Sequence, residues 1–313
     1  MGWLGWAGVV LLVFAGCLYG VYRIALFRNP VALLDLADRT LRMDGDPRLA
    51  AAARYGSDPA QKIRFYVPDS AKGPLPVVVF VHGGGWDSGD PDDYTFIARA
   101  IAPKGYAVAL AGYRLYPRSV YPGMLEDTAG AVRWVREHAA ALGGDPQRIV
   151  LAGHSAGAYN AVMVALDREW LDRAGVQDGS LRGVIGLAGP YDFLPLDSPM
   201  TVASFGHAPD LPATQPVRYA RSDAPPLLLL TGDRDTTVRP RNSIAMARAM
   251  TAAGAPTKAE IFTGIDHQTV LTTLARPFSR DPRVLDSVLR FLARVTAPAP
   301  SAQVQRAAGM PAG

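Results

Sequence analysis

The chain has 313 residues, and its hydrophobic content of 49% is enough for one sizeable core. Its net charge is +4, but the arginines are scattered and only four of the 32 basic residues are lysines, so the basic patch that nucleic-acid binding requires is not predicted. Cys17 is the only cysteine, which excludes an intrachain disulfide and a metal centre built from cysteines.

The first 22 residues carry no charged side chain, and their core reads WLGWAGVVLLVFAGCLYGVY. Twenty helical residues rise about 30 Å, the thickness of the hydrocarbon layer of a bilayer. We therefore expect residues 1–28 to form a single transmembrane anchor, with a lipid bilayer as its partner. A cleaved signal peptide and a lipoprotein modified at Cys17 are the alternatives. Arg23 and Arg28 follow the segment, so the positive-inside rule favours a cytoplasmic position for the rest of the chain.

Residues 29–55 are predicted to be a connector with a helix-like stretch that begins at Pro30. The Ala- and Pro-rich residues 296–313 are predicted to be a disordered tail, because such a composition buries too little apolar surface to order itself. No internal repeat divides the chain between these segments, so residues 56–295 are expected to form one domain.

Short apolar runs alternate with helical patterns throughout that domain. This alternation predicts an α/β fold with a mostly parallel sheet and helices on both of its faces. The strands are expected at 63–67, 77–81, 107–111, 149–152, 184–187, 227–230 and 259–262, and the helices at 126–142, 158–171, 242–253 and 283–295. Functional sites in such sheets lie at the carboxyl ends of the strands, so motifs that directly follow a strand are the candidates for chemistry.

A G-x-S-x-G pattern follows the strand predicted at 149–152 and opens the next helix, in the order Gly153-His154-Ser155-Ala156-Gly157. A sharp turn at this point raises the Ser155 hydroxyl above the sheet, and glycines on both sides leave room for the neighbouring strand and helix. Ser155 is therefore the expected nucleophile, and the His154 side chain is expected to point away from the site.

A glycine-rich loop follows the strand at 77–81 directly, with the sequence His82-Gly83-Gly84-Gly85-Trp86. Three glycines let the main chain approach a substrate closely with its amides unencumbered. We expect the amides of Gly84, Gly85 and Ala156 to hold the oxyanion of a tetrahedral intermediate. His82 is expected to brace the loop.

The acid and the base of a catalytic triad have to follow the serine in the order Asp or Glu, then His. Asp233 and Asp235 both follow the strand at 227–230, and Asp235 lies deeper in the loop. Of the five histidines, only His267 follows these carboxylates. Its predicted role is to take the proton of Ser155 and return it to the leaving alkoxide.

These motifs make the chain resemble the α/β-hydrolase superfamily, and within it the esterase and lipase group with an H-G-G-G-W loop, which includes enzymes similar to feruloyl esterases and kynurenine formamidases. The resemblance runs from about Tyr55 to Val295 and includes YGSDPAQKIRFYVP, HGGGW, GGDPQRIVLAGHSAG and APPLLLLTGDRD. It implies a triad of Ser155, Asp235 and His267. Residues 190–223 resemble a short lid. The chain departs from the group's usual pattern at Gly112, Ala158 and Gln268.

The sequence thus predicts a serine carboxylesterase that hydrolyses short or medium acyl esters through an acyl-enzyme. An arylformamidase is the alternative activity, and a membrane-anchored binding protein on an inactive hydrolase fold is the alternative of another class. No metal or cofactor is predicted, because the chain has neither a ligand cluster with metal-site spacing nor a nucleotide-binding glycine loop. The sequence makes no prediction about oligomeric state.

Overall fold

The computed structural model describes residues 29–41, 46–71, 73–176, 179–276 and 278–298. The predicted transmembrane anchor at 1–28 lies outside the described residues, as does most of the predicted tail at 296–313. Among the residues that are described, no helix has both the length and the apolar character needed to cross a bilayer.

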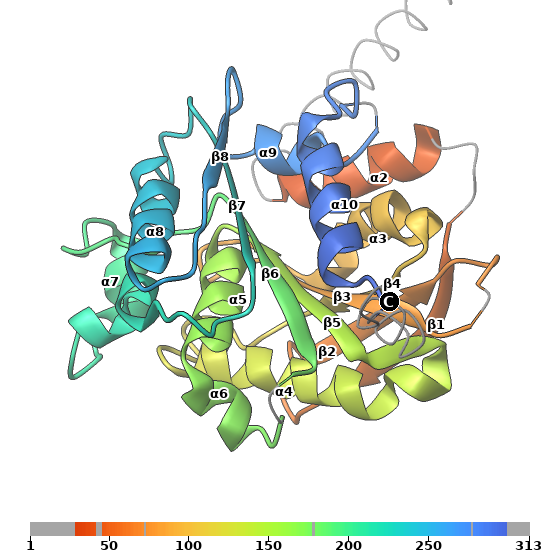
Figure 1. The fold of residues 1–313 in the computed structure, drawn as a ribbon, viewed down its shortest axis with the longest axis horizontal. Helices are drawn as coiled ribbons and strands as arrows, with labels where there is room; N and C mark the ends of the chain where they lie inside the picture. The colour runs from red at the N-terminus through yellow and green to blue at the C-terminus, as the bar shows by residue number, and fades with distance from the viewer. Residues whose placement is uncertain (1–28, 42–45, 72, 177–178, 277, 299–313) are drawn as a thin grey trace, which may run out of the picture.

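Eight strands form one sheet in the order β1-β2-β4-β3-β5-β6-β7-β8 (Figure 1). The strands from β4 to β8 in this order are all parallel, whereas β2 runs antiparallel to both β1 and β4. The predicted mostly parallel sheet is therefore confirmed. The bounds are β1 (Arg48–Arg54), β2 (Lys62–Val67), β3 (Leu75–Val81), β4 (Ala107–Ala111), β5 (Gly144–His154), β6 (Leu181–Leu187), β7 (Leu227–Gly232) and β8 (Ala259–Phe262).

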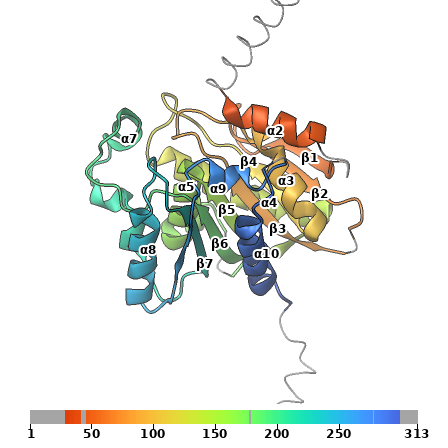
Figure 2. The same cartoon turned by 90° about the horizontal axis from the view of Figure 1, so that it is seen from above.

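Helices cover both faces of the sheet (Figure 1). One group is α4 (Gly123–His138), α5 (Ala156–Leu166), α6 (Arg168–Arg173) and α8 (Arg241–Ala252), with α7 (Pro199–Phe205) at the periphery beside α8 (Figure 2). The other group is α2 (Pro30–Leu41), α3 (Thr95–Ile101), α9 (Thr269–Thr272) and α10 (Arg283–Val295). Short 3₁₀ turns occur at Pro91–Tyr94, Ala102–Lys104, Ala139–Leu142, Pro212–Thr214 and Pro216–Tyr219.

Alternate residues of the central strands supply the two hydrophobic cores. In β3, Val77, Val79 and Val81 pack under the α4–α5 side, whereas Val78 and Phe80 pack under the α3–α10 side. All five side chains are almost completely buried. The prediction that this strand is buried on both faces is confirmed, and it explains why the run contains no polar residue.

The helix-like stretch predicted to begin at Pro30 is confirmed as α2, whereas the prediction that 29–55 is only a connector is wrong for the described part of that stretch. It contains α2, whose Leu34 joins a core, and β1, which pairs with β2 along the edge of the sheet. The strand RLAAAAR has no β-branched or aromatic residue, so its composition does not indicate a strand, and pairing with β2 supplies the order.

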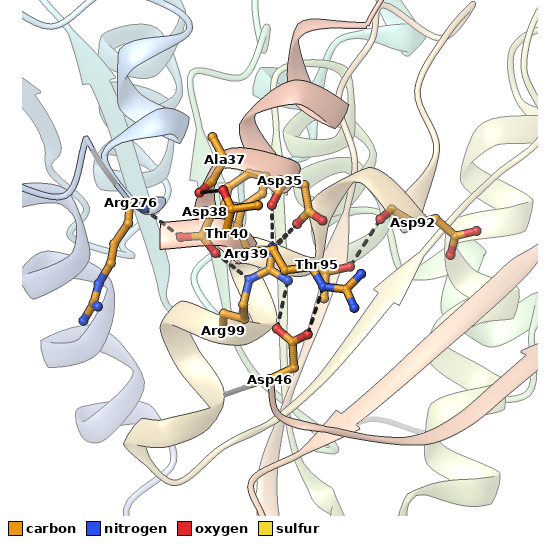
Figure 3. Close-up of polar contacts among 11 residues, drawn as sticks. Asp35, Ala37, Asp38, Arg39, Thr40, Asp46, Asp92, Thr95, Arg99 and Arg276 are labelled. Atoms are coloured by element: carbon orange, nitrogen blue, oxygen red, sulfur yellow. Dashed lines mark hydrogen bonds and ion pairs between the residues drawn. The ribbon is translucent and has the colours of Figure 1, made fainter. Parts of the chain in front are cut away.

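A buried ion cluster holds α2 against α3 (Figure 3). The guanidinium of Arg99, only 1% exposed, forms ion pairs with the carboxylates of Asp35, Asp38 and Asp46. The other oxygen of Asp38 accepts a hydrogen bond of 2.7 Å from the backbone amide of Arg276, which follows α9. Because Arg99 and Arg276 are both far from α2 in the sequence, the cluster ties the chain's first described helix into the domain.

Two helices differ from their predictions. The helix expected at 158–171 is divided into α5 and α6, because Asp167 adopts an extended conformation and its side chain caps α6 by accepting from the amide of Glu169. The sequence pattern also did not indicate α3, whose short run TFIARAI is buried at every residue after the first. A helix this uniformly buried has no polar face to give it a periodicity.

Candidate active site

Ser155 lies in a strained turn between β5 and α5. Its backbone angles are φ 53° and ψ −120°, in a region that residues other than glycine rarely occupy. The turn is possible because both flanking residues are glycines and have no Cβ. A Cβ on Gly153 would lie 2.3 Å from the carbonyl oxygen of Gly157, and one on Gly157 would lie 2.2 Å from the carbonyl oxygen of Val81. The two glycines therefore let β5, α5 and β3 approach closely, and the serine is left half-buried at the corner.

The three side chains predicted to form a triad converge at this corner. The Oγ of Ser155 lies 3.0 Å from Nε2 of His267, and Nδ1 of His267 lies 2.8 Å from Oδ2 of Asp235. His267 and Asp235 are 6% and 3% exposed. This arrangement assigns the Nδ1 proton to the hydrogen bond with the carboxylate and leaves Nε2 free to accept the proton of Ser155.

The structure distinguishes the roles of Asp235 and Asp233, the two carboxylates that the sequence left as alternatives. The second oxygen of Asp235 accepts from the backbone amides of Thr237, at 3.0 Å, and Val238, at 2.7 Å, which fixes the carboxylate toward His267. Asp233 instead accepts from the amide of Gly264 at 2.7 Å and ties two loops together. Asp235 is the residue beside the histidine, and Asp233 shapes the turn.

The glycine-rich loop after β3 bends beside Ser155 through three consecutive residues with positive φ: Gly84 at 108°, Gly85 at 59° and Trp86 at 68°. A Cβ on Gly84 would lie 2.2 Å from the carbonyl oxygen of Ser88, so only glycine fits that position. Gly85 and Ala156 line one pocket together with Ser155, and Ala156 is the first residue of α5, where a backbone amide has no partner within the helix.

Trp86 anchors this loop to the helix that carries the serine turn. Its indole nitrogen donates to Oδ1 of Asn160 on α5 at 3.1 Å, and its ring packs edge-on against Tyr159 and Phe205. Trp86 is 4% exposed. The loop and the serine turn are therefore held in one packed unit.

His82 braces the loop as expected. Its Nδ1 lies 2.7 Å from the carbonyl of Gly83, and its ring stacks on Tyr113 with 4.5 Å between centroids. Because it is buried, the pKa of His82 is lowered to about 4. The neutral ring therefore acts as a spacer for the main chain.

The expectation that His154 points away from the site is wrong. Its Nε2 lies 3.0 Å from the carbonyl oxygen of His267, and the two rings are 4.9 Å apart. Burial, and then the proximity of His267, lowers the pKa of His154 to about 3, so the ring is neutral and donates to that carbonyl. A Cβ on Gly83 would lie 3.0 Å from its other nitrogen. His154 thus fills the space between the glycine loop and His267.

Ser155 lines two pockets, which share Gly85, Met200 and Thr237. The larger, of about 490 Å³, is also lined by His267 and reaches Asn29, Pro30 and Val31 at the start of α2. The smaller, of about 360 Å³, is lined instead by Ala156, Trp86 and Phe193 and by residues after β7. The two pockets therefore differ in their lining: His267 lines the larger one and Ala156 the smaller one.

The lid predicted at 190–223 contributes to both pockets. Met200 on α7 lies directly over Gly85, where an added Cβ would be 1.5 Å from its sulfur. Phe205, at the other end of α7, is completely buried against Trp86. Within the described residues, no group of three or more His, Cys, Asp or Glu side chains is arranged to hold a metal ion.

The sequence profile of the BD-FAE family matches residues 63–250, more than half of the chain. The chain belongs to the BD-FAE family. With its sheet, its serine turn and its glycine loop, this BD-FAE chain is a member of the α/β-hydrolase esterase group, which confirms the resemblance seen in the sequence.

Named relatives of this BD-FAE chain are esterases. Carboxylesterase NlhH of Mycobacterium tuberculosis is 47% identical over 109 residues, 34% of each protein, and the probable isoprenylcysteine alpha-carbonyl methylesterase ICME of Oryza sativa is 28% identical over 254 residues, 75% of this chain and 61% of that one. The apo structure of Thermogutta terrifontis esterase 2 superposes with a TM-score of 0.67 at 26% identity, over 83% of this chain and all of the other. The matches thus span from about a third to three fifths of the curated relatives' length.

Proposed function

We propose that this chain is a serine carboxylesterase in which Ser155 is the nucleophile, His267 the general base and acid, and Asp235 the residue that orients the histidine. The observation that carries the proposal is the chain of two hydrogen bonds, 3.0 Å and 2.8 Å long, that joins the three side chains and begins at Ser155, which lines both pockets. The named relatives, which are esterases, support ester hydrolysis as the reaction.

In the first half of the reaction, Oγ of Ser155 attacks the carbonyl carbon of the ester while Nε2 of His267 accepts the hydroxyl proton. The negative charge that develops on the carbonyl oxygen is stabilised by the backbone amides of Gly84, Gly85 and Ala156. When the bond between the carbon and the alcohol oxygen breaks, that oxygen takes the proton from Nε2. The products are an acyl group on Ser155 and a free alcohol.

In the second half, water attacks the acyl carbon and gives a proton to Nε2 of His267. Collapse of the second tetrahedral intermediate breaks the bond to Oγ of Ser155, which regains the proton. Asp235 stabilises the imidazolium that forms in both halves and keeps the Nδ1 proton in place. The carboxylic acid then leaves and the resting enzyme is restored.

The pockets support short or medium acyl groups. His267 has to reach the leaving oxygen, so the alcohol occupies the larger pocket, which His267 lines, and the acyl chain occupies the smaller one, beside Ala156. A volume of about 360 Å³, lined by Phe193 and by Met200 of α7, suits a short chain. An aryl formamide is the comparison substrate that separates this activity from arylformamidase action.

The test is hydrolysis of p-nitrophenyl butyrate by the full chain and by Ser155→Ala. We expect kcat to fall by about 10⁴-fold or more, because the residual rate then comes from the oxyanion donors alone. A fluorophosphonate probe is expected to label the wild-type protein and leave Ser155→Ala unlabelled. Full activity in the variant, or a higher kcat/KM for the aryl formamide than for the ester, contradicts the proposal.

We also propose that residues 1–28 attach the enzyme to a bilayer, with the catalytic domain on the cytoplasmic side. The proposal is supported by the uncharged apolar run that ends at Tyr22 and by Asn29, soon after it, which lines the larger pocket. The measurement is fractionation of cells that express the full chain. Release of the protein by an alkaline carbonate wash, or digestion of the domain by protease added to intact cells, contradicts it.

A further inference from the structure

The smaller pocket carries a charge that the reaction itself does not require. Arg239, from the segment between β7 and α8, and Arg241, the first residue of α8, line it together with Ser155 and Ala156. Both arginines are exposed, and neither forms an ion pair with any residue in the part of the chain that the structure describes. Asp197 lines the same pocket and is the one carboxylate among its lining residues, so the pocket has an excess of positive charge.

The position of Arg241 runs against local helix preference. It is the first residue of α8, and the first turn of this helix contains no acidic side chain. A helix N-terminus carries partial positive charge, so a cation there destabilises the helix and an anion stabilises it. A residue that breaks a local rule with no compensating contact often serves function rather than folding.

The larger pocket has the opposite character. Asp87, Asp90 and Asp93 line it, and no lysine or arginine is among its lining residues. Asp90 is paired with Lys62, and Asp93 accepts a hydrogen bond from Asn29, whereas Asp87 is exposed. An anionic group on a substrate is therefore attracted to the Arg239 side and repelled from the Asp87 side.

We propose that the preferred substrates are esters whose acyl group ends in a carboxylate, that is, monoesters of dicarboxylic acids, with the free carboxylate bound by Arg239 and Arg241. This rests on the proposed function, because the acyl chain enters the smaller pocket only if His267 protonates the leaving alcohol on the other side. Guanidinium groups suit the ligand, since they bind carboxylates through paired hydrogen bonds.

The experiment compares kcat/KM of the full chain for two matched pairs, monomethyl glutarate against methyl pentanoate and monomethyl adipate against methyl hexanoate, by methanol release. We expect the charged ester to be preferred in at least one pair. The ratio of charged to neutral kcat/KM is expected to fall about 3- to 10-fold in Arg239→Gln and in Arg241→Gln, and further in the double variant. Raising the ionic strength from about 0.05 M to about 0.5 M is expected to reduce the ratio in the unmodified protein.

Matched controls separate this charge from a general electrostatic effect. Arg248 lies on α8 but lines neither pocket at Ser155, so Arg248→Gln is expected to leave the ratio unchanged. Asp197→Asn is expected to raise it. The butyrate ester of glycolic acid carries its carboxylate on the alcohol side and is expected to react more slowly than methyl butyrate.

Three results overturn the inference. A preference for the neutral ester in both pairs excludes a carboxylate-ended acyl group as the preferred substrate. An unchanged ratio in the double arginine variant excludes Arg239 and Arg241 as the groups that bind the carboxylate. Faster hydrolysis of the glycolate ester reverses the assignment of the pockets. In each case hydrolysis of neutral esters that depends on Ser155 leaves the proposed function intact, whereas no hydrolysis of any ester ends both.

Discussion

Polar side chains are buried in two regions of this molecule, and the regions differ in how completely they are paired. Around Arg99, the guanidinium has three carboxylates as partners, and Asp38 also accepts from the backbone of Arg276. At the serine turn, His267 is bound to Asp235 on one side, and on the other it meets only a hydroxyl that is still partly exposed. Full pairing fixes a structure, whereas an open position beside a bound histidine leaves a group that can exchange a proton.

The two regions also differ in their backbone conformation. Ser155 and Trp86, neither of them a glycine, occupy conformations with positive φ, and neighbouring glycines accept close contacts that a Cβ would prevent. Arg99 and two of its partners, Asp35 and Asp38, lie on the regular helices α3 and α2. Strain is therefore concentrated where the site needs a particular direction of a side chain or an amide. The ion cluster attaches α2 to the domain without strain in the backbone.

The largest expected difference between the regions is in catalysis. His267→Ala is expected to lower kcat/KM for p-nitrophenyl butyrate by about 10⁶-fold, because the serine loses its base, with little change in the unfolding midpoint. The control is His138→Ala, a surface histidine stacked on Trp134 of α4, which is expected to leave kcat/KM unchanged. A loss smaller than ten-fold in the His267 variant excludes this histidine as the base.

A second effect is expected in stability. Arg99→Leu leaves the buried carboxylate of Asp38 without its cation, and the free energy of unfolding is expected to fall by about 3–5 kcal/mol in urea. Arg64→Leu removes a half-exposed pair with Asp92 and is expected to cost no more than about 1 kcal/mol. Similar losses in the two variants contradict the distinction between a buried cluster and a surface pair. The kcat of folded Arg99→Leu is expected to stay within about three-fold of wild type, since Arg99 touches neither pocket at Ser155.

The smallest effect is a pH dependence with opposite signs in the two regions. Burial lowers the pKa of His82 from 6.5 to about 4, so its contribution to stability is present above pH 6.5 and is lost as the pH falls through about 4. Burial raises the pKa of Asp35 from 3.8 to about 6, so its contribution is present below pH 3.8 and is lost as the pH rises through about 6.

Acidification from pH 6.5 to 4 therefore reduces the stability that His82 contributes. Over the same range the Asp35 carboxyl contributes more stability and opposes that loss. In Asp35→Asn this opposition is absent, and the free energy of unfolding is expected to fall more steeply over this range, by on the order of 2 kcal/mol relative to wild type. Urea unfolding of both proteins at several pH values measures the two slopes. Equal slopes contradict the raised pKa of Asp35.

Most of the sheet and the residues at its catalytic corner were predictable because their signals are local. The serine turn, the glycine loop and the VVVFV strand each occupy a few consecutive residues, and the order of the chain restricts the histidine to His267. The convergence of Ser155, Asp235 and His267 was therefore expected from sequence alone. The preference for Asp235 over Asp233 came from the resemblance and from depth in the loop.

The features that the sequence did not predict depend on contacts between residues that are distant in the sequence. His154 turns toward the site because the carbonyl of His267, more than a hundred residues away, accepts its hydrogen bond. Arg99 and Asp38 are 61 residues apart, and no periodicity connects them. The alanines of β1 are ordered by their pairing with β2. Signals of this kind appear only when the fold brings the segments together.

The outermost strand β1 has one more consequence. Its register with β2 shifts between Leu49 and Ala51, and its two ends are Arg48 and Arg54. An irregular strand with a charge at each end is a poor template for another chain, since an incoming strand needs a continuous row of amides and tolerates little repulsion. At the opposite margin β8 is only four residues long. Both margins, as far as the structure describes them, therefore disfavour the addition of strands from another copy of the chain.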